Sequence, residues 1–237
     1  MRILMISDIH ANPWALDAIQ EDAGPCDYVL CAGDVVTYGP NGSACIAWLR
    51  DHEAIVARGN HDNAVAFNAH PRASPSKAHL ALAMRDWARR SLTASDISWL
   101  SRLPVRLLWS AGSTQFEVLH ATPLDPMYDY RLRPEISDVD LASLLGGCRS
   151  ADVLLVGHTH LPLDRKYGPL KIVNPGSAGQ PLDGDPRAAY AVWEDGQILL
   201  RRVAYDQAAL LRDIQNMPIE PDIAAGLTKT LINGKLF

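Results

Sequence analysis

The chain of 237 residues is long enough to bury a sizeable core, as one large domain or two small ones. Its hydrophobic content of 48% and charged content of 21% are ordinary for a soluble globular protein, and no apolar stretch approaches the ~18 residues that span a bilayer. The net charge of −5 argues against an extended nucleic-acid-binding surface, which depends on clustered Lys and Arg, but allows a small phosphate ligand.

The cysteines and the first residues predict a cytoplasmic protein that does not enter a membrane. The opening segment "MRILMISD" turns acidic too soon for the apolar region of a signal peptide. The cysteines lack metal-binding spacing and are interpreted as reduced thiols: Cys26, Cys31, Cys45 and Cys148.

The first part of the chain alternates between apolar runs and segments with helical spacing. Strands are expected at residues 2–7, 28–32 and 54–57, and helices at 13–23 and 41–52. This β-α-β-α-β order predicts a mostly parallel sheet with right-handed crossovers.

Residues 63–102 contain no strand signal and are interpreted as a helical insert that could cap a site. Helices are expected there at 76–92 and 95–104. Beyond Val105 the pattern is rich in strands, expected at 105–110, 115–120, 152–157, 170–173, 188–194 and 197–203, with a helix at 137–148. A helix at 206–217 opens a C-terminal helical tail, 206–237. We expect one α/β domain over 1–237, with two sheets and flanking helices.

Polar residues that can bind a metal follow five of the expected strands. Asp8 and His10 follow the first, in "SDIH", and the others are Asp34 in "GD", Asn60 in "RGNHD", His120, and the pair His158 and His160 in "GHTH". Ligands of open α/β sheets bind outside the carboxyl ends of the strands, so these residues are expected to converge.

Each of these residues also has an ordinary explanation. Asp8 could cap the following helix, Asp34 could be a turn residue, Asn60 after glycine suits a left-handed turn, and His120 could be a hydrogen-bonded core histidine. So many polar groups beside a core would be costly without a partner, and a metal centre supplies one. Carboxylate, imidazole and amide ligands without thiolate favour divalent Mn, Fe, Zn, Co or Ni, and the number of ligands favours two ions.

In their order along the chain, these motifs resemble the calcineurin-like metallophosphoesterases. The resemblance covers almost the whole chain and extends to "VNPGSAGQPLDGDPRAAYAV", which is similar to a bacterial and archaeal branch of small phosphodiesterase-like members. It implies a four-layer α-β-β-α sandwich of two mixed β-sheets flanked by helices.

The resemblance also implies a dinuclear centre and a reaction. By motif position, the first ion takes Asp8, His10, Asp34 and His160, and the second takes Asp34, Asn60, His120 and His158. Two ions roughly 3.5–4 Å apart can clamp a phosphoryl group while a metal-bound hydroxide attacks phosphorus in line. His61 is then the proton donor to the leaving group and Asp62 orients or polarises it, although His61 could also be a hydrogen-bonded turn residue. The expected substrate is a small phosphate ester or nucleotide, a phosphodiester rather than a monoester.

Contacts to the rest of the substrate are weakly indicated by the sequence. Arg58, Arg131 and Arg187 are candidates, and a surface arginine paired with a carboxylate is an equal alternative for each. The segment 121–132 carries Tyr128 and Tyr130 and could wall the pocket, where aromatic rings would suit a nucleobase.

Two features qualify the resemblance. Ala11 and Ala121 stand where the family usually has glycine, which places a methyl group near the metals.

The alternative function is a non-catalytic metal-containing binding or scaffold module of the same fold, or a phosphate-responsive regulator. A binding module need not keep His61, so this histidine favours the enzyme.

Overall fold

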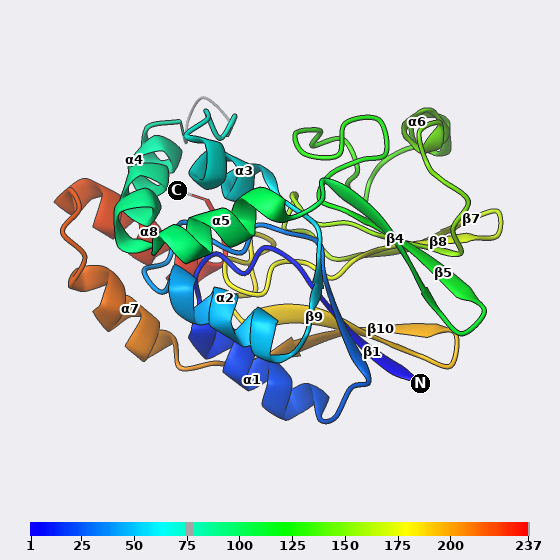
Figure 1. The fold of residues 1–237 in the computed structure, drawn as a ribbon, viewed down its shortest axis with the longest axis horizontal. Coiled ribbons are helices and arrows are strands. Elements are labelled where there is room, and N and C mark those ends of the chain that lie inside the picture. The colour runs from blue at the N-terminus through cyan, green and yellow to red at the C-terminus, as the bar shows by residue number, and fades with distance from the viewer. Residues whose placement is uncertain (74–77, 237) are drawn as a thin grey trace.

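Two five-stranded mixed sheets pack face to face, with helices on their outer sides (Figure 1). The computed structural model describes residues 1–73 and 78–236. The outer helices are α1 (Pro13–Ala23) and α2 (Gly42–Asp51) on one side and α6 (Asp138–Leu145) on the other. The predicted four-layer α-β-β-α sandwich is therefore confirmed.

The first sheet has the strand order β10-β9-β1-β2-β3. The first three strands of the chain run parallel, and the last two join as an antiparallel hairpin beside β1. Their bounds are β1 (Arg2–Ile6), β2 (Tyr28–Cys31), β3 (Ile55–Val56), β9 (Ala188–Glu194) and β10 (Gln197–Val203).

The second sheet has the order β4-β5-β6-β8-β7, with β5, β6 and β8 parallel. Its strands are β4 (Arg106–Ala111), β5 (Thr114–Leu119), β6 (Val153–Leu155), β7 (Leu163–Tyr167) and β8 (Leu170–Asn174). Strand β7 was not predicted, because its sequence "LDRKY" lies at the sheet edge and is mostly exposed. It pairs with β8 through a tight turn at Gly168, whose φ is +57°.

Alternating side chains of each central strand supply two different layers of core. In β1, Ile3 and Met5 enter the cluster between the sheets, whereas Leu4 and Ile6 pack under α1 and α2. Successive side chains of a strand point to opposite faces, so a strand covered on both sides reads as a continuous apolar run.

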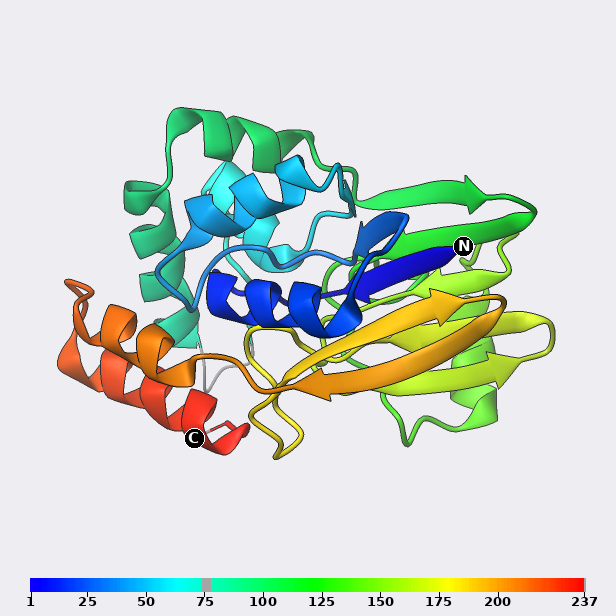
Figure 2. The ribbon, with the colours of Figure 1, turned by 90° about the horizontal axis from the view of Figure 1, so that it is seen from below.

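The remaining helices gather at one end of the sandwich (Figure 2). Helix α3 (Asn60–Phe67) was not predicted. The C-terminal tail forms a helix within the expected 206–217 and a second helix that the sequence analysis did not locate. The first two residues of the helix expected at 76–92 lie outside the described residues. No helix in the described ranges is long and apolar enough to cross a membrane. The helices that gather at this end of the sandwich are α3, α4 (Ala78–Ser91), α5 (Ala94–Arg102), α7 (Gln207–Gln215) and α8 (Pro221–Asn233).

Candidate metal centre

The polar residues that follow the strands converge on one buried site, as the sequence predicts. Each is at most 6% exposed. They come from the segments after β1 and β2, the start of α3, and the ends of β5 and β6: Asp8, His10, Asp34, Asn60, His120, His158 and His160.

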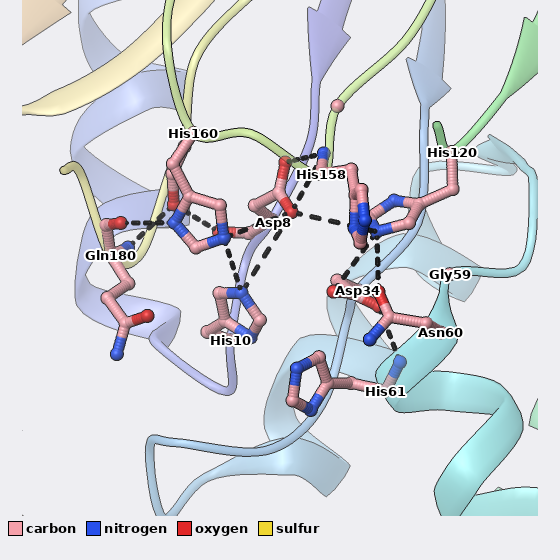
Figure 3. A network of polar contacts seen from close by, with 12 residues as sticks. Asp8, His10, Asp34, Gly59, Asn60, His61, His120, His158, His160 and Gln180 are labelled. Atoms are coloured by element: carbon pink, nitrogen blue, oxygen red, sulfur yellow. Dashed lines mark hydrogen bonds and ion pairs between the residues drawn. The ribbon is translucent and has the colours of Figure 1, made fainter. Parts of the chain in front are cut away.

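These side chains form two groups that could each hold a metal ion (Figure 3). In each group the three ligand atoms lie within 4.8 Å of one another. The first group is Asp8, His10 and His160, and the second is Asp34, His120 and His158. The sets implied by the motif order add Asp34 to the first group and Asn60 to the second, and these ligand assignments remain a prediction.

Backbone carbonyls hold three of the histidine rings. Nδ1 of His120 lies 2.8 Å from the Ala32 carbonyl oxygen and Nδ1 of His160 lies 2.5 Å from that of Gln180. Nδ1 of His10 is 3.4 Å from the Val36 carbonyl. A carbonyl oxygen can only accept a hydrogen bond, so in a neutral ring Nδ1 carries the proton. Nε2 then has a lone pair that can accept a hydrogen bond or bind a metal. Such outer contacts orient metal-binding imidazoles.

The first group has the chemistry of a cation site. Nε2 of His10 and Nε2 of His160 lie 3.2 Å apart, and both are acceptors when the carbonyls take the Nδ1 protons. Asp8 Oδ1 adds a third acceptor, 3.4 Å from His160 Nε2 and 3.9 Å from His10 Nε2. Three converging electron pairs repel one another unless a positive ion lies between them. The residues therefore fit a divalent metal.

Asn60 extends the second group with an amide oxygen. Its Nδ2 donates to the Pro71 carbonyl at 2.8 Å, which turns Oδ1 toward His120 Nε2 at 3.0 Å. That same nitrogen lies 3.2 Å from Asp34 Oδ2 and 3.1 Å from His158 Nδ1. The amide orientation is thus the one a metal-binding asparagine needs.

Burial shifts the pKa values of the ligand candidates. It raises the pKa of Asp8 and lowers the pKa of His10 well below its ordinary value, because a charged form loses its hydration inside the protein. A divalent cation reverses the effect on Asp8 by favouring the carboxylate, and it adds to the effect on His10 because a ligand imidazole must be unprotonated.

The two groups are close enough to share a carboxylate. Asp8 Oδ1 lies within 4.0 Å of ring nitrogens from both groups, 4.0 Å from His120 Nε2 in the second. Asp34 Oδ1 accepts from the His61 amide at 2.8 Å and its Oδ2 faces His120. The bridging role expected of Asp34 remains a prediction.

His61 lines the cavity beside the metal-ligand candidates, whereas the Asp62 carboxylate contacts backbone amides. The His61 ring lies edge-on to His10, with centroids 5.4 Å apart, and 4.8 Å from the ring of Tyr38. The Asp62 carboxylate accepts from the amides of Gly59 at 3.0 Å and of Asp34 and Val35 at 2.9 Å each. It therefore positions the segments that carry Asp34 and His61.

The ligand-bearing turns have unusual backbone geometry. Non-glycine residues in the left-handed region are strained, and such strain collects at functional sites. Ala11, where the family usually has glycine, has a φ of 53° and is fully covered. Five of the seven metal-ligand candidates have positive φ angles of 48–68°: Asp8, His10, Asp34, His158 and His160.

Two glycines make room for the carboxylates. A Cβ at Gly59 would lie 2.1 Å from Asp34 Oδ1, and one at Gly157 would lie 2.6 Å from Asp8 Oδ2. Any larger residue would displace a ligand. This explains glycine in "RGNHD" and "GHTH".

Four of the metal-ligand candidates line a cavity of about 260 Å³ and form what we call its floor: Asp34, Asn60, His158 and His160. Tyr38, Tyr130 and Arg133 also line it, with apolar side chains. Leu236, beyond the last helix, contributes to this lining, and Ala73 contributes from the expected helical insert. The capping role of that insert remains a prediction.

The three arginines proposed as substrate contacts do not line this cavity. Arg131 is held by Asp129, with Nη2 2.7 Å from Oδ2, and Arg187 is held in the same way by Asp185. Arg58 donates to the Ser101 carbonyl at 3.0 Å and lies over the Phe67 ring, so it joins α3 to α5. The Asp-x-Arg spacing in "DYR" and "DPR" was a sequence signal for these local pairs.

Tyr38 and Arg133 are among the cavity residues that sequence reasoning missed. Tyr38 lies four residues after Asp34 in "GDVVTYGP" and has a φ of 63°. Hydropathy does not indicate that its side chain lines the cavity. Arg133 stands two residues after Arg131, and no local pattern shows which of the two faces the site.

The model of the calcineurin-like phosphoesterase superfamily domain matches residues 1–195. The chain therefore belongs to this superfamily, as the motifs predicted. The match includes every metal-ligand candidate and ends before α7 and α8.

Bacterial and archaeal proteins are similar over most of the chain. A metallophosphoesterase from Sphaerobacter thermophilus is 31% identical, with 99% of both chains covered and a TM-score of 0.79. A hypothetical protein from Pyrococcus horikoshii shares the fold, at 19% identity, a TM-score of 0.83 and coverage of 100% and 99%. An uncharacterized protein of Methanocaldococcus jannaschii is 28% identical over 228 residues, 86% of this chain and 88% of that protein.

Proposed function

We propose that the protein is a dinuclear metal-dependent phosphoesterase that hydrolyses small phosphodiesters. The observation that carries this proposal is a pair of three-residue ligand groups, each of which contributes to the lining of one cavity that His61 also lines. Membership of the phosphoesterase superfamily supports the same class of reaction.

The ligand groups would hold two divalent ions, of Mn, Fe, Zn, Co or Ni. When bound, such ions polarise phosphoryl oxygens and lower the pKa of the attacking water. Asp8, His10 and His160 would hold the first, and Asp34, His120 and His158 the second, with Asn60 as a further oxygen ligand. Burial of these side chains excludes bulk water and strengthens every electrostatic interaction with the ester.

His61 is proposed to give a proton to the leaving oxygen. Its ring lies in the cavity lining and belongs to neither of the two ligand groups, which supports a role in proton transfer and not in metal binding. The main-chain contact to Asp34 and the Asp62 contacts fix the start of α3, from which the ring projects. General acid catalysis of this kind contributes roughly 10²–10⁴-fold.

The cavity lining favours a diester over a monoester. Beyond the proposed metal ions, Arg133 is the only arginine or lysine among the described lining residues, which suits a monoanionic diester better than a monoester dianion. The leucines of the lining can accept a second organic group, which only a diester carries.

We place this activity in the cytoplasm. The support is the state of the cysteines, since all four are free thiols: Cys26, Cys31, Cys45 and Cys148. Free thiols are typical of a reducing compartment.

Hydrolysis of bis-p-nitrophenyl phosphate and p-nitrophenyl phosphate by the Mn²⁺-loaded protein tests the proposal. We expect faster turnover of the diester, and His61→Ala should lose about 10²–10⁴-fold in kcat while keeping the wild-type metal content. A fully loaded wild type that is inert on both esters would favour a binding module. Loss of metal in His61→Ala would contradict the assigned role.

A further inference from the structure

Tyr130 packs against His158 of the second ligand group. Its ring centroid lies 3.8 Å from that of His158, with the planes tilted by 31°. The tyrosine also lines the cavity, and 40% of the residue is exposed. One face of the phenol ring therefore packs on a metal-ligand candidate, and another part of the ring is accessible from the cavity.

Arg133 contributes a positive charge to the same cavity, and its present partner is an exposed glutamate. Its Nε lies 3.5 Å from Glu135 Oε1, and both side chains are largely exposed, at 48% and 72%. Exposed ion pairs of this kind contribute little to stability, so an anion in the cavity can replace Glu135 as the partner of Arg133. Arg131 differs, because Asp129 takes both its Nε and its Nη2.

Part of the cavity lining is apolar. Leu161, Leu182 and Leu236 line the cavity together with Tyr130 and the metal-ligand candidates of the floor. The cavity thus offers a metal-binding floor, an aromatic ring, apolar side chains and one cation. Its volume of about 260 Å³ lies just below the range of roughly 300–1,000 Å³ typical of drug-sized ligands.

We propose that Tyr130 and Arg133 determine substrate specificity by recognising the organic part of the ester. The substrate class is a small phosphoester with a flat aromatic ring and a further negative charge. The ring stacks on Tyr130 and the negative group binds Arg133, while the phosphoryl group lies at the floor. The location of the phosphoryl group rests on the proposed phosphoesterase function.

The test uses phosphonates, which are not hydrolysed, so that binding is measured apart from catalysis. Methylphosphonate, phenylphosphonate and 4-carboxyphenylphosphonate are titrated into the Mn²⁺-loaded protein by calorimetry. Ring stacking predicts that the wild type binds phenylphosphonate about 5- to 100-fold more tightly than methylphosphonate. The added carboxylate should tighten binding further, by about threefold or more, because it forms a charge-assisted contact with Arg133.

Matched variants separate recognition from folding. Tyr130→Leu should bring phenyl- and methylphosphonate to within about threefold of each other, and Tyr130→Phe should keep the ring preference. Tyr128→Leu is the control, since Tyr128 lies in the same loop, contacts Asn63 and Arg72, and does not line the cavity. Arg133→Gln should remove only the preference for the carboxylate, whereas Arg131→Gln should keep it.

The outcomes distinguish this inference from the proposed function. Equal affinity of the wild type for methyl- and phenylphosphonate, or a ring preference that survives in Tyr130→Leu, overturns the inference even if diesters are hydrolysed. A ring preference that depends on Tyr130 in a protein that hydrolyses no ester supports the inference and removes the proposed function. If Tyr130→Leu does not fold, the wild-type ring preference and Arg133→Gln decide the result.

Discussion

Asp62 joins the segments that carry the metal ligands. Its two carboxylate oxygens accept from backbone amides after β2 and at the start of α3. The residue is fully buried, and burial raises its pKa to about 6. The carboxylate therefore replaces the hydrogen bonds that these amides would make with water.

Replacing Asp62 by asparagine should destabilise the protein and disturb the second ligand group. An amide turns one NH₂ toward donors, so at least one buried N–H loses its acceptor at a cost of about 1–3 kcal/mol. Urea unfolding measures this change. Asp51→Asn, at an exposed position, should stay within about 0.5 kcal/mol of the wild type. Equal stability of the two variants would show that Asp62 is not structurally required.

The metal ligands were predictable because each directly follows an apolar run, and parallel strands bring their carboxyl ends together. The arginines were not, because the direction of a long side chain depends on its neighbours. Arg131 and Arg187 have an aspartate two residues earlier, which holds them at the surface. Tyr38 and Arg133 are placed by tertiary contacts that no local pattern records.

At the scale of one element, α5 depends on a capping box that reaches a second helix. Thr93 Oγ1 accepts from the Asp96 amide at 3.1 Å, and the Asp96 carboxylate accepts from Thr93 N at 3.2 Å. Ser43 Oγ of α2 also donates to Asp96 at 2.7 Å. Burial acts to raise the pKa of Asp96, but the hydrogen bonds from Ser43 and Thr93 outweigh it and hold the pKa below its ordinary value.

The stability that Asp96 contributes should therefore depend on pH. A depressed folded-state pKa means that the contribution is complete above the unfolded pKa of about 3.9 and is lost as pH falls through the folded value. Asp96→Asn should cost about 1 kcal/mol at pH 7. In urea unfolding at several pH values, the difference from wild type should shrink below about pH 4. A difference that stays constant down to pH 2 would contradict this explanation.

Long apolar strands and capped helices were predictable at this scale, whereas α3 and β7 were not. Helix α3 begins at Asn60, within "GNHD", where ligand chemistry fixes the residues and hydrophobic spacing is weak. Strand β7 is an edge strand with little to bury, so its polar sequence carries no period-2 signal.

At the scale of the whole molecule, the C-terminal helices α7 and α8 pack against a residue that lines the cavity. Leu210, Ile214 and Leu227 pack with Met84 of α4 and with Tyr38 of the cavity wall. Figure 2 shows α7 and α8 side by side at this end of the sandwich. These helices therefore pack against Tyr38, one of the residues that line the cavity.

Leu227→Ala should weaken this docking. Leu227 is 0% exposed, so its truncation leaves a cavity and should cost about 2–5 kcal/mol in the free energy of unfolding. Ile232, on the same helix, is 48% exposed, and Ile232→Ala should change stability by no more than about 0.5 kcal/mol. Thermal and urea unfolding compare the two variants, and equal effects would mean that α8 does not contribute to the core.

The overall architecture was predictable from the order of elements together with the motifs. The alternation of Ile3 and Met5 with Leu4 and Ile6 needs cover on both faces of the sheet, which only layered folds supply. The C-terminal packing was not predictable, because α8 gains its partners from α4 and Tyr38, which are remote in sequence.

The number of divalent ions bound per chain tests the central claim most directly. Titration of metal-stripped protein with Mn²⁺ or Zn²⁺ by calorimetry, with metal analysis of the same samples, should give two ions in the wild type. His10→Ala and His158→Ala remove one ligand from different groups, so each should retain one tightly bound ion. A wild type that binds one ion or none, or variants that both bind as the wild type does, would contradict the dinuclear centre.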